Sequence, residues 1–402
     1  MITKKRHYFV EFLFVLALAT KPLYLRKSGS LQISDVLFVL LALFVTLTER
    51  KVILEFTSYQ LLKLICCIIV YQIFVNFLGP TLWNPTGEPG VIFSVNLYYL
   101  FNLIVVYCVL SVARIEGFQR TVQFFLIGTV ASIAVSLVGV LQGGSDGSRE
   151  TGFFNNPNQL GYFCIVVMTV LVVFKRQITA WIRLLCFAIC TYMVILSLSK
   201  AAIAAVAILL LLYTNEFDRK VDGKRFLFSF LGVAIAMLLI YVLLYADNPS
   251  ITRLPYVRMM RTRMLNMMHE GDSDLISGRG YGRIKEIGPC LLFGVGEGMN
   301  LRFESLSGFE VHSTYASTLV SYGIIGVILY IVLVRRAIYN RTFGIRYSSS
   351  FLGIAIYSFT HNGIRSTLLW ALLAMSYLYL KNGKASQEHL APETTSMVDT
   401  TQ

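Results

Sequence analysis

Long runs of apolar residues recur along almost the whole chain, and they limit the fold more than any other feature. Each run holds about 17 to 23 residues, enough for an α-helix to cross roughly 30 Å of hydrocarbon. The runs are continuous and do not alternate with polar residues, so they predict helices and not the strands of a barrel. Hydrophobic residues make up 56% of the chain, far more than in soluble domains. The sequence therefore predicts an all-α polytopic membrane protein.

About twelve of these runs are candidates for transmembrane helices. The first follows MITKKR and resembles a signal peptide, but the many spans behind it and the lack of a convincing cleavage site favour a retained helix. The predicted spans are 8–20, 33–48, 61–78, 91–112, 121–141, 159–174, 182–197, 201–214, 226–246, 313–334, 347–361 and 365–380. They divide the chain into 1–246 (helices one to nine), 247–311 (a large outer loop with short helices), 312–384 (helices ten to twelve) and 385–402 (a disordered cytoplasmic tail).

Lys and Arg are distributed unequally between the connecting segments, and this bias predicts the topology. With a cytoplasmic N-terminus, most basic residues fall in inner segments, whereas the outer loops 79–90 and 142–158 hold only Arg149 between them. We therefore expect a multi-pass protein with both termini in the cytoplasm. The bias also explains the net charge of +13, so no nucleic-acid partner is expected. Three basic residues of the first outer loop depart from the pattern: Lys21, Arg26 and Lys27.

The cysteines predict neither a metal site nor a disulfide framework. Most lie inside apolar runs, and no spacing to another Cys or to a His is typical of metal ligands. We expect no metal and no cofactor. The cysteines within apolar runs are Cys66, Cys67, Cys108, Cys164, Cys186 and Cys190, and Cys290 lies in a loop.

The long loop 247–311 contains the segment SDLISGRGYGRIKEIGP, which predicts a short helix ending at Gly288-Pro289. Arg279 and Arg283 are four residues apart and would project from one face of that helix. Two neighbouring guanidinium groups suit a pyrophosphate, since Arg binds phosphate oxygens through two hydrogen bonds. Alternatively, Arg283 pairs with Glu286 and Arg279 is solvated. Upstream, ITRLPYVRMMRTRMLNMM fits an amphipathic helix that lies on membrane lipids.

Two other outer segments carry polar residues beside apolar runs. Lys200, in VILSLSKAAIAAVAILLLLY, is predicted at a tight hairpin between two helices, and the alternatives are a solvated turn lysine or one that faces a polar cavity. In RETGFFNNPNQLGYF, Pro157 and the Asn residues predict a turn, with Asn158 as the N-cap of the next helix. Any ligand contact of Asn158 would be additional to this structural role.

Two histidines lie at predicted helix boundaries on the outer side. His312 follows Glu310 and precedes the run LVSYGIIGVILYIVLV, while His361 lies in SFTHNGIRSTLLW close to Arg365. A boundary histidine without other support is more often structural than catalytic, but here the basic and histidine positions converge on one face. The glycines of GVGEG resemble a phosphate loop, yet no strand precedes them, so a dinucleotide site is excluded.

These segments, in this order, resemble the O-antigen ligase and Wzy polymerase superfamily of multispan glycosyltransferases of the GT-C type. The order is FFNNPNQLG, LSLSKAAI, R-x-x-x-R ahead of GVGEG, VHSTY and SFTHNGIRSTLLW, and the resemblance covers roughly residues 90–380. It implies a bacterial inner-membrane enzyme that works at the periplasmic face without a metal. The implied donor is a glycan on undecaprenyl pyrophosphate, and the acceptor is a hydroxyl group of another glycan.

The resemblance also implies roles for individual residues. His312 matches the loop histidine that activates the acceptor hydroxyl, and Arg279 and Arg283 match the arginines that hold the donor pyrophosphate. Lys200 stands where many relatives have Arg. The lysine keeps the positive charge but cannot bind a phosphate through the two parallel hydrogen bonds of a guanidinium group. Relatives often carry Asn at the position of Ser313. Further candidates for substrate contact are His361, Arg365, Asn158 and Glu310.

Three functions remain open at this point. We expect a polysaccharide polymerase that joins lipid-linked repeat units of O-antigen, capsule or exopolysaccharide. The alternative is an O-antigen ligase, which transfers the finished glycan to lipid A core in lipopolysaccharide biosynthesis. A transporter or flippase of such lipids is less favoured, because few acidic residues lie in the apolar runs and no internal repeat is visible. Expected partners are the lipid-linked oligosaccharides, membrane lipids, a flippase and a chain-length regulator.

Overall fold

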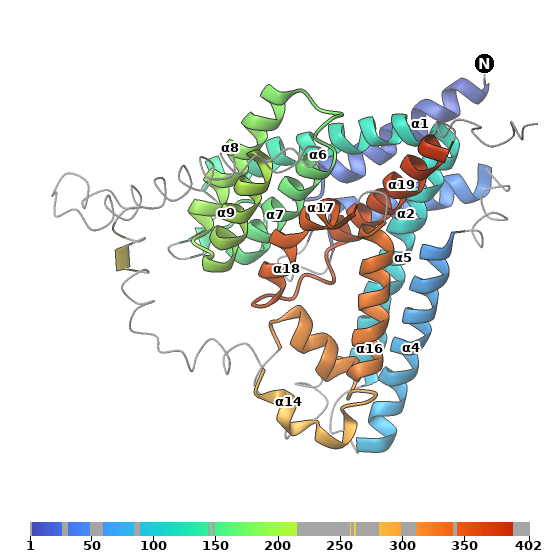
Figure 1. Cartoon of the computed structure of the whole chain (residues 1–402), viewed down its shortest axis with the longest axis vertical. Helices are drawn as coiled ribbons and strands as arrows, with labels where there is room; N and C mark the ends of the chain where they lie inside the picture. The colour runs from blue at the N-terminus through green and yellow to red at the C-terminus, as the bar shows by residue number, and fades with distance from the viewer. Residues whose placement is uncertain are drawn as a thin grey trace, which may run out of the picture.

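The computed structural model is a bundle of α-helices with very little β-structure (Figure 1). It describes residues 2–25, 31–48, 59–83, 89–143, 145–146, 149–214, 258, 261–262, 281–298, 311–340 and 344–388. The longer helices are α1 (Ile2–Ala19), α2 (Ile33–Thr48), α4 (Gln60–Trp83), α5 (Pro89–Glu116), α6 (Phe118–Leu141), α7 (Pro157–Val173), α8 (Ala180–Ser197), α9 (Lys200–Thr214), α16 (Thr314–Ile338) and α19 (Thr367–Glu388). The shorter ones are α14 (Arg283–Glu286), the 3₁₀ turn η2 (Gly288–Cys290), α17 (Gly344–Ser349) and α18 (Leu352–Ser358). The strands β1 (Ser145–Asp146) and β2 (Arg149–Glu150) pair in antiparallel orientation.

Five helices in the described part of the chain are long and apolar enough to cross a membrane. They are Gln60–Leu78 within α4, Asn96–Glu116 within α5, and the whole of α6, α8 and α16. Their exposed faces are apolar, as expected for helices that contact lipid, with Phe74, Leu185 and Ile331 each more than half exposed. The prediction of an all-α membrane protein is therefore confirmed.

The predicted number of twelve spans is not supported by the described helices. Three of the predicted spans, now α2, α7 and α9, are apolar but shorter than the five helices above. The span predicted over 347–361 is wrong as a single helix, because the chain turns at Ser350 and Phe351 between α17 and α18. The prediction for 226–246 lies outside the described residues.

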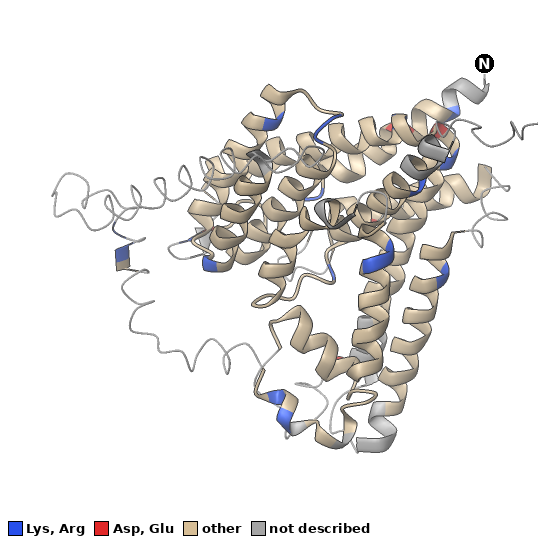
Figure 2. Cartoon of the chain, viewed as in Figure 1, with Lys and Arg blue, Asp and Glu red and all other residues tan. Residues whose placement is uncertain are grey.

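Basic residues mark the ends of the two helices nearest to α14. Lys63 lies near the start of α4, while Arg335 and Arg336 lie in the last turn of α16. Figure 2 shows these blue segments at the upper ends of the two helices, with none along their lengths and further basic residues on α14 below. A long apolar helix with basic residues at one end is typical of a helix that passes through lipid.

Helix α7 forms the centre of the upper part of the bundle. All but two of its residues are buried, and it packs against α8, α9, α18 and α19. A helix that is apolar on every side is stable either among other helices or in lipid, and α7 lies among other helices. Around this centre, α1 packs on α6 and α2, while α16 packs on α4 and α19.

Lys21, which departs from the charge bias, is buried in the turn between α1 and α2. Its Nζ lies 3.6 Å from Asp35 Oδ1 and donates a hydrogen bond to Gln32. Burial lowers the pKa of Lys21 below its ordinary value, and the nearby Asp35 carboxylate partly opposes that shift. Lys21 therefore has a structural role in this turn.

Candidate functional site

Helix α16 is broken at Gly323. This residue has φ 64° and ψ −167°, a backbone conformation that only glycine adopts readily. Residues 314–322 consequently run obliquely to residues 324–338, above α14 (Figure 1). The span predicted over 313–334 is thus helical but not continuous.

A segment of the preceding loop, residues 291–296, supplies partners for the backbone groups that the break exposes. The Val295 amide donates to the Val320 carbonyl at 3.0 Å, and the next amide donates to the Ser321 carbonyl at 2.8 Å. On the other side of the break, the Ile324 amide donates to the carbonyl of residue 291 at 2.9 Å. Non-helical backbone at membrane depth is stable only when protein or water satisfies such groups. The loop segment is therefore part of the helical bundle.

Glycines permit this close approach of two backbones. A Cβ on Gly323 would lie 2.3 Å from the Leu292 carbonyl oxygen, and one on Gly294 would lie 2.4 Å from the Ser321 backbone. Gly294 also has a positive φ of 83°. Gly294 and Gly296 of GVGEG thus belong to a loop that docks on the broken helix.

His312 is exposed and directly precedes the N-cap of α16. Its neighbours Val311 and Ser313 are both buried, so the backbone is held on either side of the imidazole. The Ser313 hydroxyl accepts a hydrogen bond from the Ala316 amide at 3.3 Å and lies 2.8 Å from the Tyr281 hydroxyl. Ser313 is therefore the N-cap of α16, a position that Ser and Asn both favour.

The segment that carries His361 docks on the first turn of the same helix. The His361 carbonyl accepts hydrogen bonds from the Thr314 amide at 3.2 Å and from its hydroxyl at 2.9 Å. The Thr314 hydroxyl oxygen accepts in turn from the Gly363 amide at 3.0 Å, and Asn362 donates to Ser317 at 3.2 Å. The structure therefore brings the two histidine motifs, VHSTY and THNGIR, into direct contact.

The part of the predicted arginine helix that the structure describes lies beside this contact. Helix α14 begins at Arg283, which is half-buried, and packs against α16. Tyr281, two residues before Arg283, contacts Ser313 and donates to the Phe359 carbonyl at 2.7 Å. Helix α14 ends at Glu286, close to the predicted stop at Gly288-Pro289, and those two residues begin the 3₁₀ turn η2. Residues 281 and 282, which were also predicted to be helical, form a turn, so the described part of the predicted helix has four residues. Arg279 and Glu310 lie outside the described residues.

Asn158 is not the N-cap of α7, contrary to the sequence prediction. The cap is Asn156, whose side chain accepts a hydrogen bond from the Gln159 amide at 2.9 Å, and Pro157 occupies the first helical position. Proline favours that position because it has no N–H to leave unpaired. Asn158 instead accepts a hydrogen bond from Arg149 at 2.9 Å.

Lys200 lies at a tight hairpin, as predicted. Helix α8 ends at Ser197, Leu198 adopts a left-handed conformation, and α9 begins at Lys200, whose side chain is exposed. The Ser197 carbonyl accepts a hydrogen bond from Arg149 Nε at 2.9 Å. Arg149 therefore joins this hairpin to the start of α7.

Contacts continue from α7 to the histidine segments through α18. The Tyr357 hydroxyl donates to the Asn158 carbonyl at 2.7 Å, and its ring stacks on His361 at 4.5 Å between centroids. The motif regions of Asn158, His361 and His312 thus belong to one connected set of contacts. Lys200 adjoins this set through the α8–α9 hairpin.

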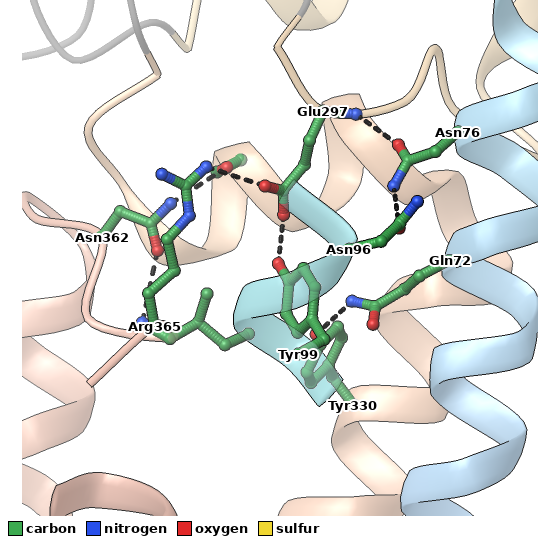
Figure 3. Close-up of polar contacts among 10 residues, drawn as sticks. Gln72, Asn76, Asn96, Tyr99, Glu297, Tyr330, Asn362 and Arg365 are labelled. Carbon is green, nitrogen blue, oxygen red and sulfur yellow. Dashed lines mark hydrogen bonds and ion pairs between the residues drawn. The ribbon is translucent and has the colours of Figure 1, made fainter. Parts of the chain in front are cut away.

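Glu297 is a residue that the sequence analysis missed. Its carboxylate is buried and lies 2.7 Å from Arg365 Nη2, while its other oxygen accepts a hydrogen bond from Tyr99 (Figure 3). The Glu297 amide donates to Asn76 Oδ1 at 2.8 Å. The available signal was a lone carboxylate in an otherwise apolar glycine-rich segment, since buried carboxylates require partners.

Further polar side chains of α4 and α5 extend this network between the helices. Asn76 Nδ2 donates to Asn96 at 2.9 Å, and Gln72 donates to the Tyr330 hydroxyl at 2.6 Å (Figure 3). The Arg365 guanidinium also lies 5.5 Å from the centre of the Tyr98 ring. Polar groups inside a helical bundle are costly unless paired in this way.

Comparisons with family models, with curated proteins and with solved structures find no match for this chain. Within the described residues, no group of three or more His, Cys, Asp or Glu side chains is arranged to hold a metal ion. The candidate site therefore consists of His312, the α14 arginine, the His361 segment and the Glu297 network.

Proposed function

We propose that this protein is a polysaccharide polymerase that transfers a glycan from undecaprenyl pyrophosphate to a hydroxyl group of another lipid-linked repeat unit. The observation that carries the proposal is the exposed His312, held between buried neighbours at the start of α16. The His361 segment and α14 both contact the structure that holds it. The described residues of these motifs, which are separate in the sequence, therefore contact one another in the fold.

In the proposed reaction, His312 accepts the proton of the acceptor hydroxyl. The hydroxyl oxygen forms a bond to the anomeric carbon, the bond from that carbon to the pyrophosphate oxygen breaks, and the anomeric configuration inverts. Negative charge then develops on undecaprenyl pyrophosphate, the leaving group. Arg283 and Arg279 stabilise that charge, and Lys200 adds a further cation. His361, Arg365, Asn158 and Glu310 remain candidates for substrate contact.

The distribution of charge supports a site at the outer, periplasmic face of the bacterial inner membrane. The basic residues at the ends of α4 and α16 lie away from α14 and from the start of α16 (Figure 2). By the positive-inside rule, those basic ends face the cytoplasm. The proposal keeps both termini in the cytoplasm, and it keeps the shorter apolar helices within the membrane as further spans.

A transporter would need ionisable groups near the middle of the membrane, and Asp35 and Glu11 are the few acidic candidates in the predicted spans. In the structure, Asp35 pairs with Lys21, and Glu11 lies 2.6 Å from Arg120 Nε. Both carboxylates therefore have structural partners, which favours an enzyme over a transporter.

The experiment that tests the proposal replaces the chromosomal gene with variants and measures the length of the surface glycan by gel electrophoresis. We expect His312→Ala to reduce polymer by about a hundredfold or more, because general-base catalysis contributes that much. Arg283→Ala should also shorten the polymer. Lys285→Ala is the control, since Lys285 is exposed on the same short helix and has no assigned role.

The products separate the alternatives. Loss of a polymerase leaves single repeat units attached to lipid A core, whereas loss of a ligase leaves full-length glycan on undecaprenyl pyrophosphate. If His312→Ala and Arg283→Ala proteins reach the membrane at normal levels and still make full-length polymer, the proposed function is wrong.

A further inference from the structure

We propose that Glu297 is a positioning residue: its ion pair with Arg365 locks the first half of α16 in place and so fixes the position of His312. The inference rests on the proposed function, because it supplies the reason for positioning His312. Glu297 acts through the backbone and has no contact with the reacting atoms in this proposal. It is not among the residues that the family resemblance assigns.

The short helical segment 314–322 is held at both ends by different loops. At its N-terminal end, Thr314 is hydrogen-bonded to His361 and Gly363. At its C-terminal end, the carbonyls of Val320 and Ser321 accept hydrogen bonds from residues 295 and 296. His312 directly precedes this segment, so its position depends on both attachments.

The ion pair joins those two loops to each other. Glu297 is the residue after Gly296, whose amide donates to the Ser321 carbonyl. Arg365 lies two residues after Gly363. The Glu297 Oε2 to Arg365 Nη2 distance is 2.7 Å. These contacts close a ring. It runs from Glu297 to Arg365 through the ion pair, along the chain to Gly363, and through the Gly363 hydrogen bond to Thr314. It then follows the helical segment to Ser321 and returns to Glu297 through the hydrogen bond of the preceding amide.

Helices α4 and α5 anchor this ring to the rest of the bundle. Tyr99 of α5 donates to the Glu297 carboxylate, and Asn76 of α4 accepts from the Glu297 amide. Tyr71 of α4 donates to the Tyr322 carbonyl at 2.8 Å, beside the break. Glu297 is thus the residue at which the loop, both long helices and the Arg365 segment meet (Figure 3).

A buried ion pair that only stabilised the bundle could be placed at any helix contact. This ion pair connects the loop that bonds the backbone at the C-terminal end of 314–322 to the segment that bonds the backbone at its N-terminal end. In the described part of the chain, Tyr71 makes the other hydrogen bond to these backbone ends from outside α16. Charge matters here because a hydrogen bond between two ionised groups is stronger than one to a neutral acceptor, so an uncharged side chain would hold the Arg365 guanidinium less firmly. The expected consequence of losing the charge is a shift of His312, not a loss of the fold.

The test compares Glu297→Gln with the parent protein in intact cells. Gln has nearly the same size and can still accept from Tyr99, but it carries no charge. We expect polymer synthesis to fall on the order of tenfold to a hundredfold, as for a catalytic group displaced by about 1 Å. Glu297→Asp keeps the charge and should retain more activity than Glu297→Gln.

A second readout does not depend on polymerase activity. The substitution His312→Cys places a thiol at the site. It is made together with Cys67→Ser, because Cys67 is the exposed cysteine of the parent chain and would also be labelled. The rate at which a membrane-impermeant maleimide labels this thiol then reports how accessible position 312 is. We expect Glu297→Gln to change its labelling rate severalfold. Glu11→Gln is the matched control, because it breaks an ion pair on α1 and should leave the rate unchanged.

Arg365→Lys is the second variant if Glu297→Gln does not accumulate. It keeps the positive charge but loses the geometry of the guanidinium, and it should change the labelling rate in the same way. The inference is overturned if both variants label position 312 at the parental rate while His312→Ala is inactive. If His312→Ala makes normal polymer, the proposed function fails instead, and the labelling rates still decide whether Glu297 positions this segment.

Discussion

The start of α7 and the break of α16 differ in the source of their hydrogen-bond partners. At the start of α7, the cap is Asn156, and its partner is the amide of Gln159 in the same turn. At the break of α16, the partners come from residues 291–296, a separate segment of the chain. The first arrangement forms from neighbouring residues, whereas the second exists only once the bundle has assembled.

The difference predicts unequal sensitivity to mutation. An unsatisfied backbone group in lipid costs several kcal/mol, so the broken helix depends strongly on the docked loop. A lost N-cap costs about 1 kcal/mol, because water or the chain itself provides a substitute. Substitutions at the break of α16 should therefore be more damaging than substitutions at the start of α7.

Gly323→Ala should have the largest effect on stability. The backbone conformation alone costs a non-glycine residue about 1–3 kcal/mol. The new Cβ would also meet the Leu292 carbonyl oxygen at 2.3 Å, and a backbone atom cannot move aside without undocking the loop. We expect a much lower midpoint of thermal unfolding in detergent, measured by loss of monodisperse protein on size-exclusion chromatography.

Gly117→Ala is the control for that prediction. Gly117 has φ 79° and ψ 154°, close to the conformation of Gly323, but a Cβ there meets no atom within 4 Å. The Gly117→Ala variant should therefore lose only the stability that the unfavourable backbone conformation costs. Equal midpoints for the two variants would show that the close approach to Leu292 does not matter.

Arg149→Ala should have an intermediate effect, at the corner between α7 and α8. It removes hydrogen bonds to the Ser197 carbonyl and to Asn158, and hydrogen bonds to a charged group each contribute about 1.5–3 kcal/mol. We expect a moderate decrease in the unfolding midpoint. Arg149→Lys should recover part of it, since a cation near the end of α8 remains favourable. A parental midpoint for Arg149→Ala would contradict the role of this corner.

Asn156→Ala should have the smallest effect, about 1 kcal/mol, from loss of the N-cap. Asn158→Ala provides the comparison, because its side chain bonds to Arg149 and not to the helix. In the Arg149→Ala background, Asn158→Ala should add little further destabilisation, whereas Asn156→Ala should still add its full effect. The same unfolding assay measures both, and the reverse result would make Asn158 the cap.

Local sequence patterns predicted much of the fold. The span predicted over 33–48 coincides with α2, and the hairpin at Lys200 is confirmed. Of the helix predicted before Gly288-Pro289, the described residues form α14, which ends at Glu286. The cap of α7 was assigned to the wrong Asn, although Pro157 at the first helical position was a usable signal for Asn156. Length and apolarity did not predict which runs are long single helices: the run 347–361 is divided between α17 and α18, with a turn between them.

The sequence by itself determined the helical membrane class, the positions of most helices and the choice of His312, Arg283 and Lys200 as candidates. Those properties depend on neighbouring residues and on the thickness of the bilayer. Only the tertiary structure decided that α16 breaks at Gly323, that the His361 segment docks on Thr314, and that Glu297 pairs with Arg365. Each of these features needs a partner from a distant part of the chain, and a backbone group or a buried charge acquires such a partner only when the helices pack.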